Sequence, residues 1–288
     1  MSALHALTAV LRLMRPHQWL KNVFVFAGLV FSQSWAQADM VQRVLFAFVA
    51  FCCVSSFVYI VNDWYDRASD ALHPVKRHRP LANGHVSGTV AALLALLLVT
   101  LGVGFAHDNT PLLTLLGLYV GLNLAYSWRL KHVPVVDVSL IASGFMLRLF
   151  AGTWAVGIAP SRWLLLTGMF VALFLGFSKR RAESFRDHAS KRAVLTLYPD
   201  ALLDMLMAAT LAALLMTYSL FASSPEAQLQ HGERLLYTIP IVIFATLRYA
   251  YQVHQGRGED VAHDLLHDPW TISAALAWAA IFLSPHWW

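Results

Sequence analysis

Long apolar stretches, separated by short polar segments, recur along almost the whole chain. Most of them approach the roughly 20 apolar residues that a helix needs to cross a lipid bilayer. The pattern predicts about nine transmembrane helices, over residues 20–36, 40–62, 86–106, 111–128, 135–156, 161–178, 201–222, 235–252 and 270–285. Because no soluble domain or low-complexity linker fits between these stretches, we expect one transmembrane domain over residues 1–288.

The segment before the first stretch, residues 1–16, mixes apolar residues with Arg12 and Arg15 and ends at Pro16. It is too short to cross a bilayer, and proline restricts continuation of a helix. The segment therefore predicts an amphipathic helix that lies at the membrane surface.

Composition also indicates a lipid environment. Hydrophobic residues make up 58% of the chain and charged residues 13%, against about 45–50% and 25% in ordinary globular domains. This balance excludes a disordered protein, a nucleic-acid-binding domain and most soluble enzymes. The small net charge of +5 gives no reason to expect a nucleic-acid partner. The expected fold is all-α and integral to the membrane.

The distribution of Lys and Arg predicts the orientation. With the N-terminus in the cytoplasm, all but four of the 21 basic residues fall in cytoplasmic segments. The exceptions are Arg43, Arg162 and Arg234 on the outer side and Arg148 within a predicted helix. The positive-inside rule thus predicts a multi-pass protein of the cell's inner (plasma) membrane, with a cytoplasmic N-terminus and an external C-terminus. Most carboxylates share the cytoplasmic segments, so we expect the active site at that face.

An acidic motif begins at the end of the second apolar stretch. Helical spacing puts three carboxylates on one face with an amide beside them. The residues are Asn62, Asp63, Asp66 and Asp70. Carboxylates this close repel one another unless a cation lies among them, and Mg²⁺ takes oxygen ligands while leaving positions for phosphate oxygens. The motif predicts a magnesium–diphosphate site; the alternative is a solvated helix end whose acids pair with Arg67 and Lys76.

Two further cytoplasmic segments are rich in bases and could bind phosphate. Arg offers phosphate a planar fork, and Lys offers a point charge. The competing interpretation for each base is anchoring by the positive-inside rule. The residues are Lys76 and Arg79 in the proline-flanked segment 73–80, and Lys179, Arg180 and Glu183 after the sixth stretch.

A fourth segment carries charge into an apolar stretch. Tyr126 and Lys131 belong to a short cytoplasmic turn, Asp137 lies just inside the next stretch, and Arg148 follows eleven residues later. A bare charge is costly at that depth. About 16 Å would separate the two Cα atoms on a helix, so direct pairing of Asp137 with Arg148 is not expected. Arg148 therefore predicts a bound anion, unless it has a structural partner or extends to the interface.

The motif Asn62-Asp63-x-x-Asp66-x-x-x-Asp70 resembles the first aspartate-rich motif of the UbiA superfamily of intramembrane prenyltransferases. Four further motifs are similar to those of the decaprenyl-phosphate phosphoribosyltransferase branch: Arg15-Pro16-x-Gln18-Trp19-x-Lys21-Asn22, His73-Pro74-x-Lys76-x-x-Arg79-Pro80, Tyr126-Ser127-x-x-Leu130-Lys131 and Ser143-Gly144-Phe145-x-x-Arg148. The wider superfamily usually has a second aspartate-rich motif, where this chain has the basic segment 179–183. One acidic motif with many bases suits two phosphorylated substrates better than a diphosphate and a neutral aromatic acceptor.

The resemblance implies a UbiA-like bundle with a cytoplasm-facing cavity and a Mg²⁺-dependent phosphoribosyltransferase. The donor would be 5-phosphoribosyl 1-diphosphate, the acceptor a polyprenyl (decaprenyl-type) phosphate, and diphosphate would leave. The implied metal ligands are Asn62, Asp63, Asp66 and Asp70, and the implied catalytic residues are Asp63, Asp66 and Lys131. The implied substrate-binding residues are Lys21, Asn22, Lys76, Arg79, Tyr126, Lys131, Asp137, Arg148, Lys179, Arg180 and Glu183.

Two other functions stay open at this point. A UbiA-type enzyme could transfer a prenyl group from a prenyl diphosphate to an aromatic or other acceptor, which the basic segment 179–183 disfavours. A non-enzyme could carry a phosphorylated metabolite or lipid across the membrane, but charges gathered at one face argue against alternating access. The sequence leaves the isoprenoid length and the oligomeric state open, including a homo-oligomer.

Overall fold

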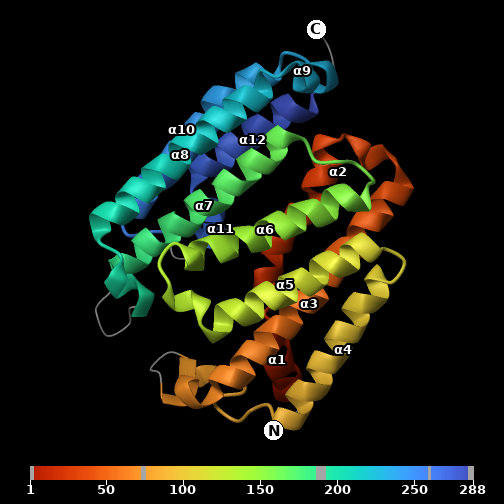
Figure 1. Ribbon diagram of the computed structural model, residues 1–288, viewed down its shortest axis with the longest axis vertical. Coiled ribbons are helices and arrows are strands. Elements are labelled where there is room, and N and C mark those ends of the chain that lie inside the picture. Colours follow the sequence, from red (N-terminus) through yellow and green to blue (C-terminus); the bar gives the residue numbers. More distant parts are fainter. Residues whose placement is uncertain (1–2, 73–75, 186–192, 259–260, 285–288) are drawn as a thin grey trace. The chain divides into compact units, whose positions relative to one another are not determined.

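The structure is a computed structural model that describes residues 3–72, 76–185, 193–258 and 261–284, and this part of the chain contains helices and no strand (Figure 1). The α-helices are α1 (Ala3–Met14), α2 (Ala27–Phe31), α3 (Ala38–Leu72), α4 (Gly88–Ala106), α5 (Thr110–Trp128), α6 (Val136–Ala155), α7 (Arg162–Ser184), α8 (Asp200–Ala222), α9 (Pro225–His231), α10 (Leu235–His254), α11 (Val261–His267) and α12 (Pro269–Leu283). The 3₁₀ helices are η1 (Pro16–Phe26), η2 (Ser34–Ala36), η3 (Lys76–His78), η4 (Leu130–His132) and η6 (Ala193–Leu197).

Eight of the nine predicted stretches correspond to single α-helices, namely α3 to α8, α10 and α12. Helices α3 and α7 continue beyond their apolar stretches, to Leu72 and Ser184. Hydropathy marks only the part of a helix that suits lipid, whereas the backbone can continue through polar residues. These two extensions carry the acidic motif and the basic segment 179–183.

The first predicted stretch, residues 20–36, is not one α-helix. The chain there forms η1, α2 and η2, and Gln33 adopts a left-handed backbone conformation with φ 54°. Polar side chains of η1 bind α3: Trp19 Nε1 donates to Ser56 Oγ at 2.9 Å, and Asn22 Nδ2 donates to Ser55 Oγ at 3.4 Å. These tertiary contacts favour a conformation that the local apolar pattern does not specify.

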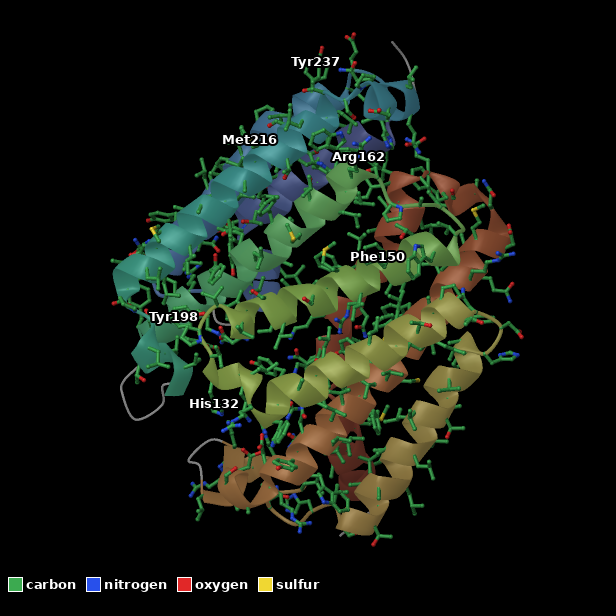
Figure 2. The ribbon with its side chains drawn as sticks, viewed as in Figure 1. His132, Phe150, Arg162, Tyr198, Met216 and Tyr237 are labelled. Atoms are coloured by element: carbon green, nitrogen blue, oxygen red, sulfur yellow. The ribbon has the colours of Figure 1, made fainter. Side chains whose placement is uncertain are left out.

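Six helices of the described chain, α3 to α8, are long and apolar enough to cross a membrane. Helix α12 is a shorter apolar helix of 15 residues. Large side chains such as Met216 on α8 and Tyr237 on α10 are exposed, at 68% and 69% (Figure 2). An all-α membrane fold is therefore confirmed, and the count of nine spans is approximate.

The described chain forms two compact units. The first contains the residues up to Leu130 together with Gly144–Pro160, and the second contains Lys131–Ser143 and the residues from Ser161 onward. The expectation of a single transmembrane domain stays a prediction.

In the first unit, α3 packs against α1, η1, α4 and α5 (Figure 1). Phe51 and Leu116 belong to its main core, and Leu13 of α1 lies in a second cluster with Ile60 of α3. A helix therefore forms within the segment 1–16, as predicted, and its place at a membrane surface stays a prediction.

In the second unit, α10 packs against α7, α8 and α12 (Figure 1). Its core includes Phe174, Leu203 and Tyr249. Gly176 of α7 lies so close to α6 that an added Cβ atom would be 2.6 Å from Val138 Cγ1. This close approach brings the charged end of α7 beside the start of α6.

Candidate active site

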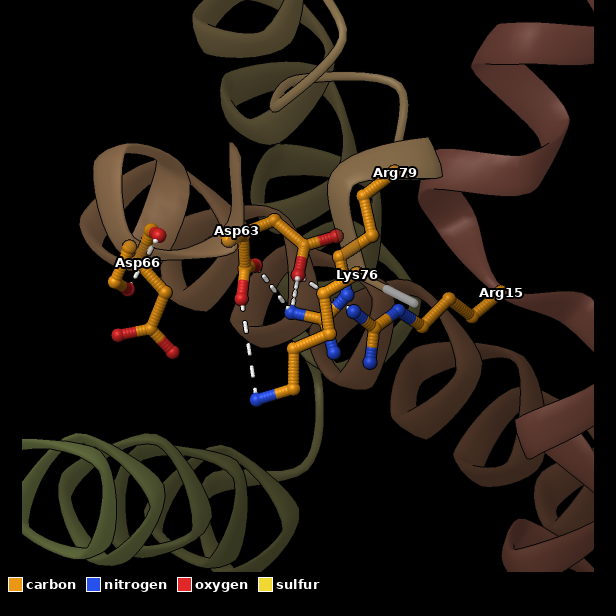
Figure 3. Close-up of polar contacts among 7 residues, drawn as sticks. Arg15, Asp63, Asp66, Lys76 and Arg79 are labelled. Carbon is orange, nitrogen blue, oxygen red and sulfur yellow. Dashed lines mark hydrogen bonds and ion pairs between the residues drawn. The ribbon is translucent and has the colours of Figure 1, made fainter. Parts of the chain in front are cut away.

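The acidic end of α3 is paired with bases of the first unit (Figure 3). Arg79 Nη1 lies 3.0 Å from Asp63 Oδ1 and 2.6 Å from Asp70 Oδ2. Lys76 Nζ is 3.9 Å from Asp70 Oδ1. Both carboxylates are buried, whereas the bases keep partial access to solvent. The structure thus joins the acidic motif to the adjacent basic segment, as charge complementarity requires.

Arg15 is a further member of this cluster that the sequence analysis did not assign to the site. Its Nη2 atom is 2.5 Å from Asp63 Oδ1, and its guanidinium lies over the ring of Tyr59, 5.2 Å from the centroid. Arg15 has a left-handed backbone with φ 54° and directly precedes Pro16, which begins η1. The motif Arg15-Pro16 was the available signal, because proline is favoured at the first position of a helix and marks where η1 begins.

Only some of the carboxylates of the acidic motif lie close together. Asp63 and Asp70 share Arg79, whereas the Asp66 carboxylate lies apart from Arg15 and Arg79 in Figure 3. Asn62 and Asp66 are partly buried. Within the described residues, no group of three or more His, Cys, Asp or Glu side chains is arranged to hold a metal ion. The predicted metal ligands therefore stay a prediction.

The chemistry of this donor set nevertheless suits Mg²⁺. Asp63 and Asp70 both contact the same nitrogen of Arg79, so their oxygens converge on a position that a single cation can occupy. The side chains of Asn62 and Asp66 add further oxygen donors on the same helix end. Mg²⁺ prefers such hard oxygen ligands, and its other positions can take phosphate oxygens.

A second cluster of the first unit surrounds Arg148, which is 4% exposed. Its Nε donates to Asn22 Oδ1 at 2.7 Å, Nη1 to Gly144 O at 2.7 Å, and Nη2 to Tyr119 Oη at 3.1 Å. The guanidinium also lies over the rings of Phe51, Tyr119 and Phe145.

Arg148 has no carboxylate partner among the described residues, where its hydrogen-bond acceptors are neutral. Hydrogen bonds and aromatic faces offset part of the cost of burying this charge. The expectation that Arg148 does not pair directly with Asp137 is supported, because the described partners of each residue lie elsewhere.

In the second unit, Asp137 is buried in a network with Arg180. Arg180 Nε donates to Asp137 Oδ2 at 2.7 Å, and Nη1 donates to Glu183 Oε2 at 2.6 Å. Tyr198 Oη donates to Asp137 Oδ1 at 2.8 Å. Burial raises the pKa of Tyr198 to about 12, so this hydroxyl keeps its proton at neutral pH. Three predicted site residues are therefore joined, and Tyr198 is a fourth member that the sequence analysis missed.

The remaining predicted residues occupy helix ends and turns. Lys21 is exposed on η1, and Tyr126 is partly buried near the end of α5. Lys131 lies in η4 and Lys179 in α7, and both are partly buried. Their roles stay predictions.

Known proteins identify the family. The chain matches the UbiA prenyltransferase family over residues 22–265. It is 36% identical over 295 residues to the decaprenyl-phosphate phosphoribosyltransferase of Corynebacterium glutamicum, covering 96% of this chain and 87% of that protein. It is 32% identical over 297 residues to the protein of the same name from Mycolicibacterium smegmatis, covering 96% and 93%.

Solved structures agree with this fold. A UbiA homolog from Archaeoglobus fulgidus bound to GPP and Mg²⁺ superimposes with a TM-score of 0.72 at 23% identity, over 95% of this chain and 98% of that one. The same homolog has also been solved with Cd²⁺. The resemblance inferred from the sequence motifs is thus confirmed. This chain belongs to the UbiA prenyltransferase family.

Proposed function

We propose that the protein transfers the 5-phosphoribosyl group of 5-phosphoribosyl 1-diphosphate to a polyprenyl phosphate of decaprenyl type, and that this transfer depends on Mg²⁺. Relatives that carry this activity in their names cover 96% of the chain. The structural observation that supports the proposal is the cluster in which Arg15, Lys76 and Arg79 meet Asp63 and Asp70. Such a cluster combines acids for a divalent cation with bases for phosphate.

Asn62, Asp63, Asp66 and Asp70 would hold Mg²⁺, which when bound would neutralise charge on the diphosphate leaving group. Lys76 and Arg79 would bind diphosphate oxygens. A lipid phosphate oxygen attacks C1 of the ribose, the bond from C1 to the diphosphate oxygen breaks, and diphosphate leaves with the electron pair. Because the attacking phosphate is already an anion, the step needs no strong general base, and positioning and electrostatics supply most of the catalysis.

The substrates carry two further phosphate groups, the donor 5-phosphate and the lipid phosphate. In the first unit, Lys21 and Arg148 are candidates to bind one of them, with Asn22 holding Arg148. In the second unit, Lys131 and Lys179 are candidates, with Tyr126 as a further candidate on α5 of the first unit. Two carboxylates more than balance the single charge of Arg180, so we assign Asp137, Arg180 and Glu183 to support of the site.

Membrane insertion rests on different observations from the choice of membrane and the orientation in it. The family and the apolar helices indicate a multi-pass membrane protein. The inner (plasma) membrane, the cytoplasmic N-terminus and the cytoplasmic active site follow from the positive-inside rule and belong to the proposal.

The test uses the purified full-length protein in lipid vesicles. With Mg²⁺, phosphoribosyl diphosphate labelled in the ribose, and decaprenyl phosphate, we expect labelled lipid, and none with EDTA or with Asp66→Ala. An absence of labelled lipid beside an active control enzyme rejects the proposal. Prenylated product formed without any sugar donor establishes prenyl transfer instead. Flux of a phosphorylated solute across vesicles, preserved in Asp66→Ala, establishes a transporter.

A further inference from the structure

Val135 has a backbone conformation that its side chain disfavours. Its φ is 66°, in the left-handed region. Among the described residues, two other non-glycine residues have positive φ, Arg15 and Gln33, and neither has a β-branched side chain. A β-branched residue in this region is a genuine outlier, and it persists where surrounding contacts impose it.

The hydroxyl of Tyr198 supplies such contacts. It accepts a hydrogen bond from the backbone N–H of Val135 and donates one to Asp137 Oδ1 at 2.8 Å. Val135 and Asp137 lie on either side of the residue that begins α6. One buried hydroxyl therefore fixes both the backbone before α6 and a side chain in its first turn.

The carboxylate of Asp137 is fixed in turn by Arg180. Arg180 is 1% exposed and Asp137 is fully buried, and Glu183 binds a second edge of the guanidinium. Asp137 therefore has little freedom to move away from Tyr198. The hydroxyl is held in place by a network that also includes the charged end of α7.

The turn that leads into Val135 carries Lys131. Lys131 belongs to η4, and Pro134 directly precedes Val135. Lys131 and His132 are held in η4, and the proline ring fixes its own φ and disfavours helical torsions at Val133, so the backbone between Lys131 and Val135 has limited freedom. The direction in which the chain enters α6 consequently sets the position of Lys131.

We infer that Tyr198 is a positioning residue, which holds Val135 in the left-handed conformation and thereby orients the Lys131 turn toward a phosphate group of a substrate. The inference rests on the proposed function, through the role of Lys131. The phosphate that the Lys131 turn contacts belongs either to the donor, as its 5-phosphate, or to the lipid, and both groups have the same chemistry. The substrate whose KM changes in Tyr198→Phe shows which phosphate it is.

The test is a double-mutant cycle in the vesicle assay. Tyr198→Phe removes only the hydroxyl, and we expect it to raise the KM of one phosphorylated substrate about tenfold, the scale of a lost buried hydrogen bond. Lys131→Met should raise the same KM. The KM of the double variant should exceed the KM of Lys131→Met by less than about twofold, because both substitutions disrupt the same coupled unit. Multiplicative effects would overturn the inference, as would an unchanged KM in Tyr198→Phe.

Rescue through the backbone keeps the test decisive if Tyr198→Phe folds poorly. Glycine adopts positive φ without steric penalty. Adding Val135→Gly to Tyr198→Phe should therefore return the KM most of the way to the wild-type value. The inference is rejected if this double variant folds and its KM stays as high as that of Tyr198→Phe. It is also rejected if the double variant folds and no longer binds the substrate. Tyr237→Phe, at an exposed position on α10, is the matched control and should leave the KM unchanged.

The outcomes separate this inference from the proposed function. If the wild-type protein makes no labelled lipid, the proposed function fails. If the wild-type protein is active and the two KM effects multiply, only the positioning role of Tyr198 fails.

Discussion

Arg79 Nη1 donates to Asp70 Oδ2 at 2.6 Å, and the same nitrogen lies 3.0 Å from Asp63 Oδ1. A guanidinium thus occupies the point on which two of the proposed metal ligands converge. If Asp63 and Asp70 hold Mg²⁺, Arg79 would have to leave these oxygens, and diphosphate oxygens would offer its guanidinium new acceptors.

This competition predicts opposite effects of Arg79→Gln with and without donor. Without donor, the variant should bind Mn²⁺, used as a substitute for Mg²⁺, more tightly because a competing cation is gone. With phosphoribosyl diphosphate, binding of the metal–donor pair should weaken by about tenfold because a charge-assisted contact to phosphate is lost. Titration followed by electron paramagnetic resonance measures both affinities. Arg77→Gln, at an exposed neighbour, is the control, and weaker Mn²⁺ binding by Arg79→Gln without donor would contradict the prediction.

Asp66 and Asp63 should differ in their contributions to stability. Asp66→Ala should abolish turnover and leave the thermal unfolding temperature close to that of the wild type. Asp63→Ala should abolish turnover and also lower stability by about 1–3 kcal/mol, because Arg15 and Arg79 lose a buried acceptor. Thermal unfolding in detergent measures the difference. Asp108→Ala, whose side chain is 87% exposed, should change neither property. An equal loss of stability in the two site variants would count against this assignment.

Arg148→Lys should not behave as a conservative change. Lysine cannot donate to Asn22, Gly144 and Tyr119 with the same planar geometry, nor stack on the three rings in the same way. We expect a loss of about 1–3 kcal/mol in stability, and Asn22→Ala should cost less stability in the Arg148→Lys background than in the wild type. Arg162→Lys, at an exposed position on α7, is the control, and its stability should stay within about 0.5 kcal/mol of that of the wild type. Additive losses from the Arg148 and Asn22 changes would refute their coupling.

Gly152 should tolerate no side chain. An added Cβ atom would lie 1.8 Å from the carbonyl oxygen of Val25 and 2.7 Å from its carbonyl carbon, and backbone atoms cannot rotate away. Gly152→Ala should therefore prevent recovery of folded protein from membranes or lower its unfolding temperature strongly. Gly121→Ala is the matched helical control, because an added Cβ atom there meets nothing within 4 Å. Size-exclusion profiles of the two variants compare them directly, and similar profiles would contradict the predicted clash.

Asp268 should make part of the stability dependent on pH. The hydrogen bond from Arg248 holds the pKa of Asp268 well below its usual value, and the carboxylate also caps α12 through the N–H of Thr271. An acid whose folded-state pKa is lowered stabilises the fold above its unfolded pKa of about 3.9, and the contribution is lost as pH falls below that value. The difference in unfolding temperature between wild type and Asp268→Asn should be largest near pH 7 and shrink below pH 4. A difference that grows with acidity would reverse the expected sign.

The sequence predicted much of the fold because helix formation and membrane insertion depend on local patterns. The apolar stretches located α3 to α8, α10 and α12, and the charges pointed to the ends of α3 and α7. The apolar pattern also predicted one helix over residues 20–36, where the structure has η1, α2 and η2. Hydropathy detects burial in an apolar medium, but it contains no information on hydrogen bonds such as that from Trp19 to Ser56.

The sequence by itself determined the membrane class, the family motifs and the set of charged residues. Only the tertiary structure decided how these charges pair: Arg148 with Asn22, 126 residues away, Arg180 with Asp137, 43 residues away, and Arg15 with Asp63, 48 residues away. A buried charge takes the partner that packing of distant segments brings within reach, and that choice depends on the whole fold.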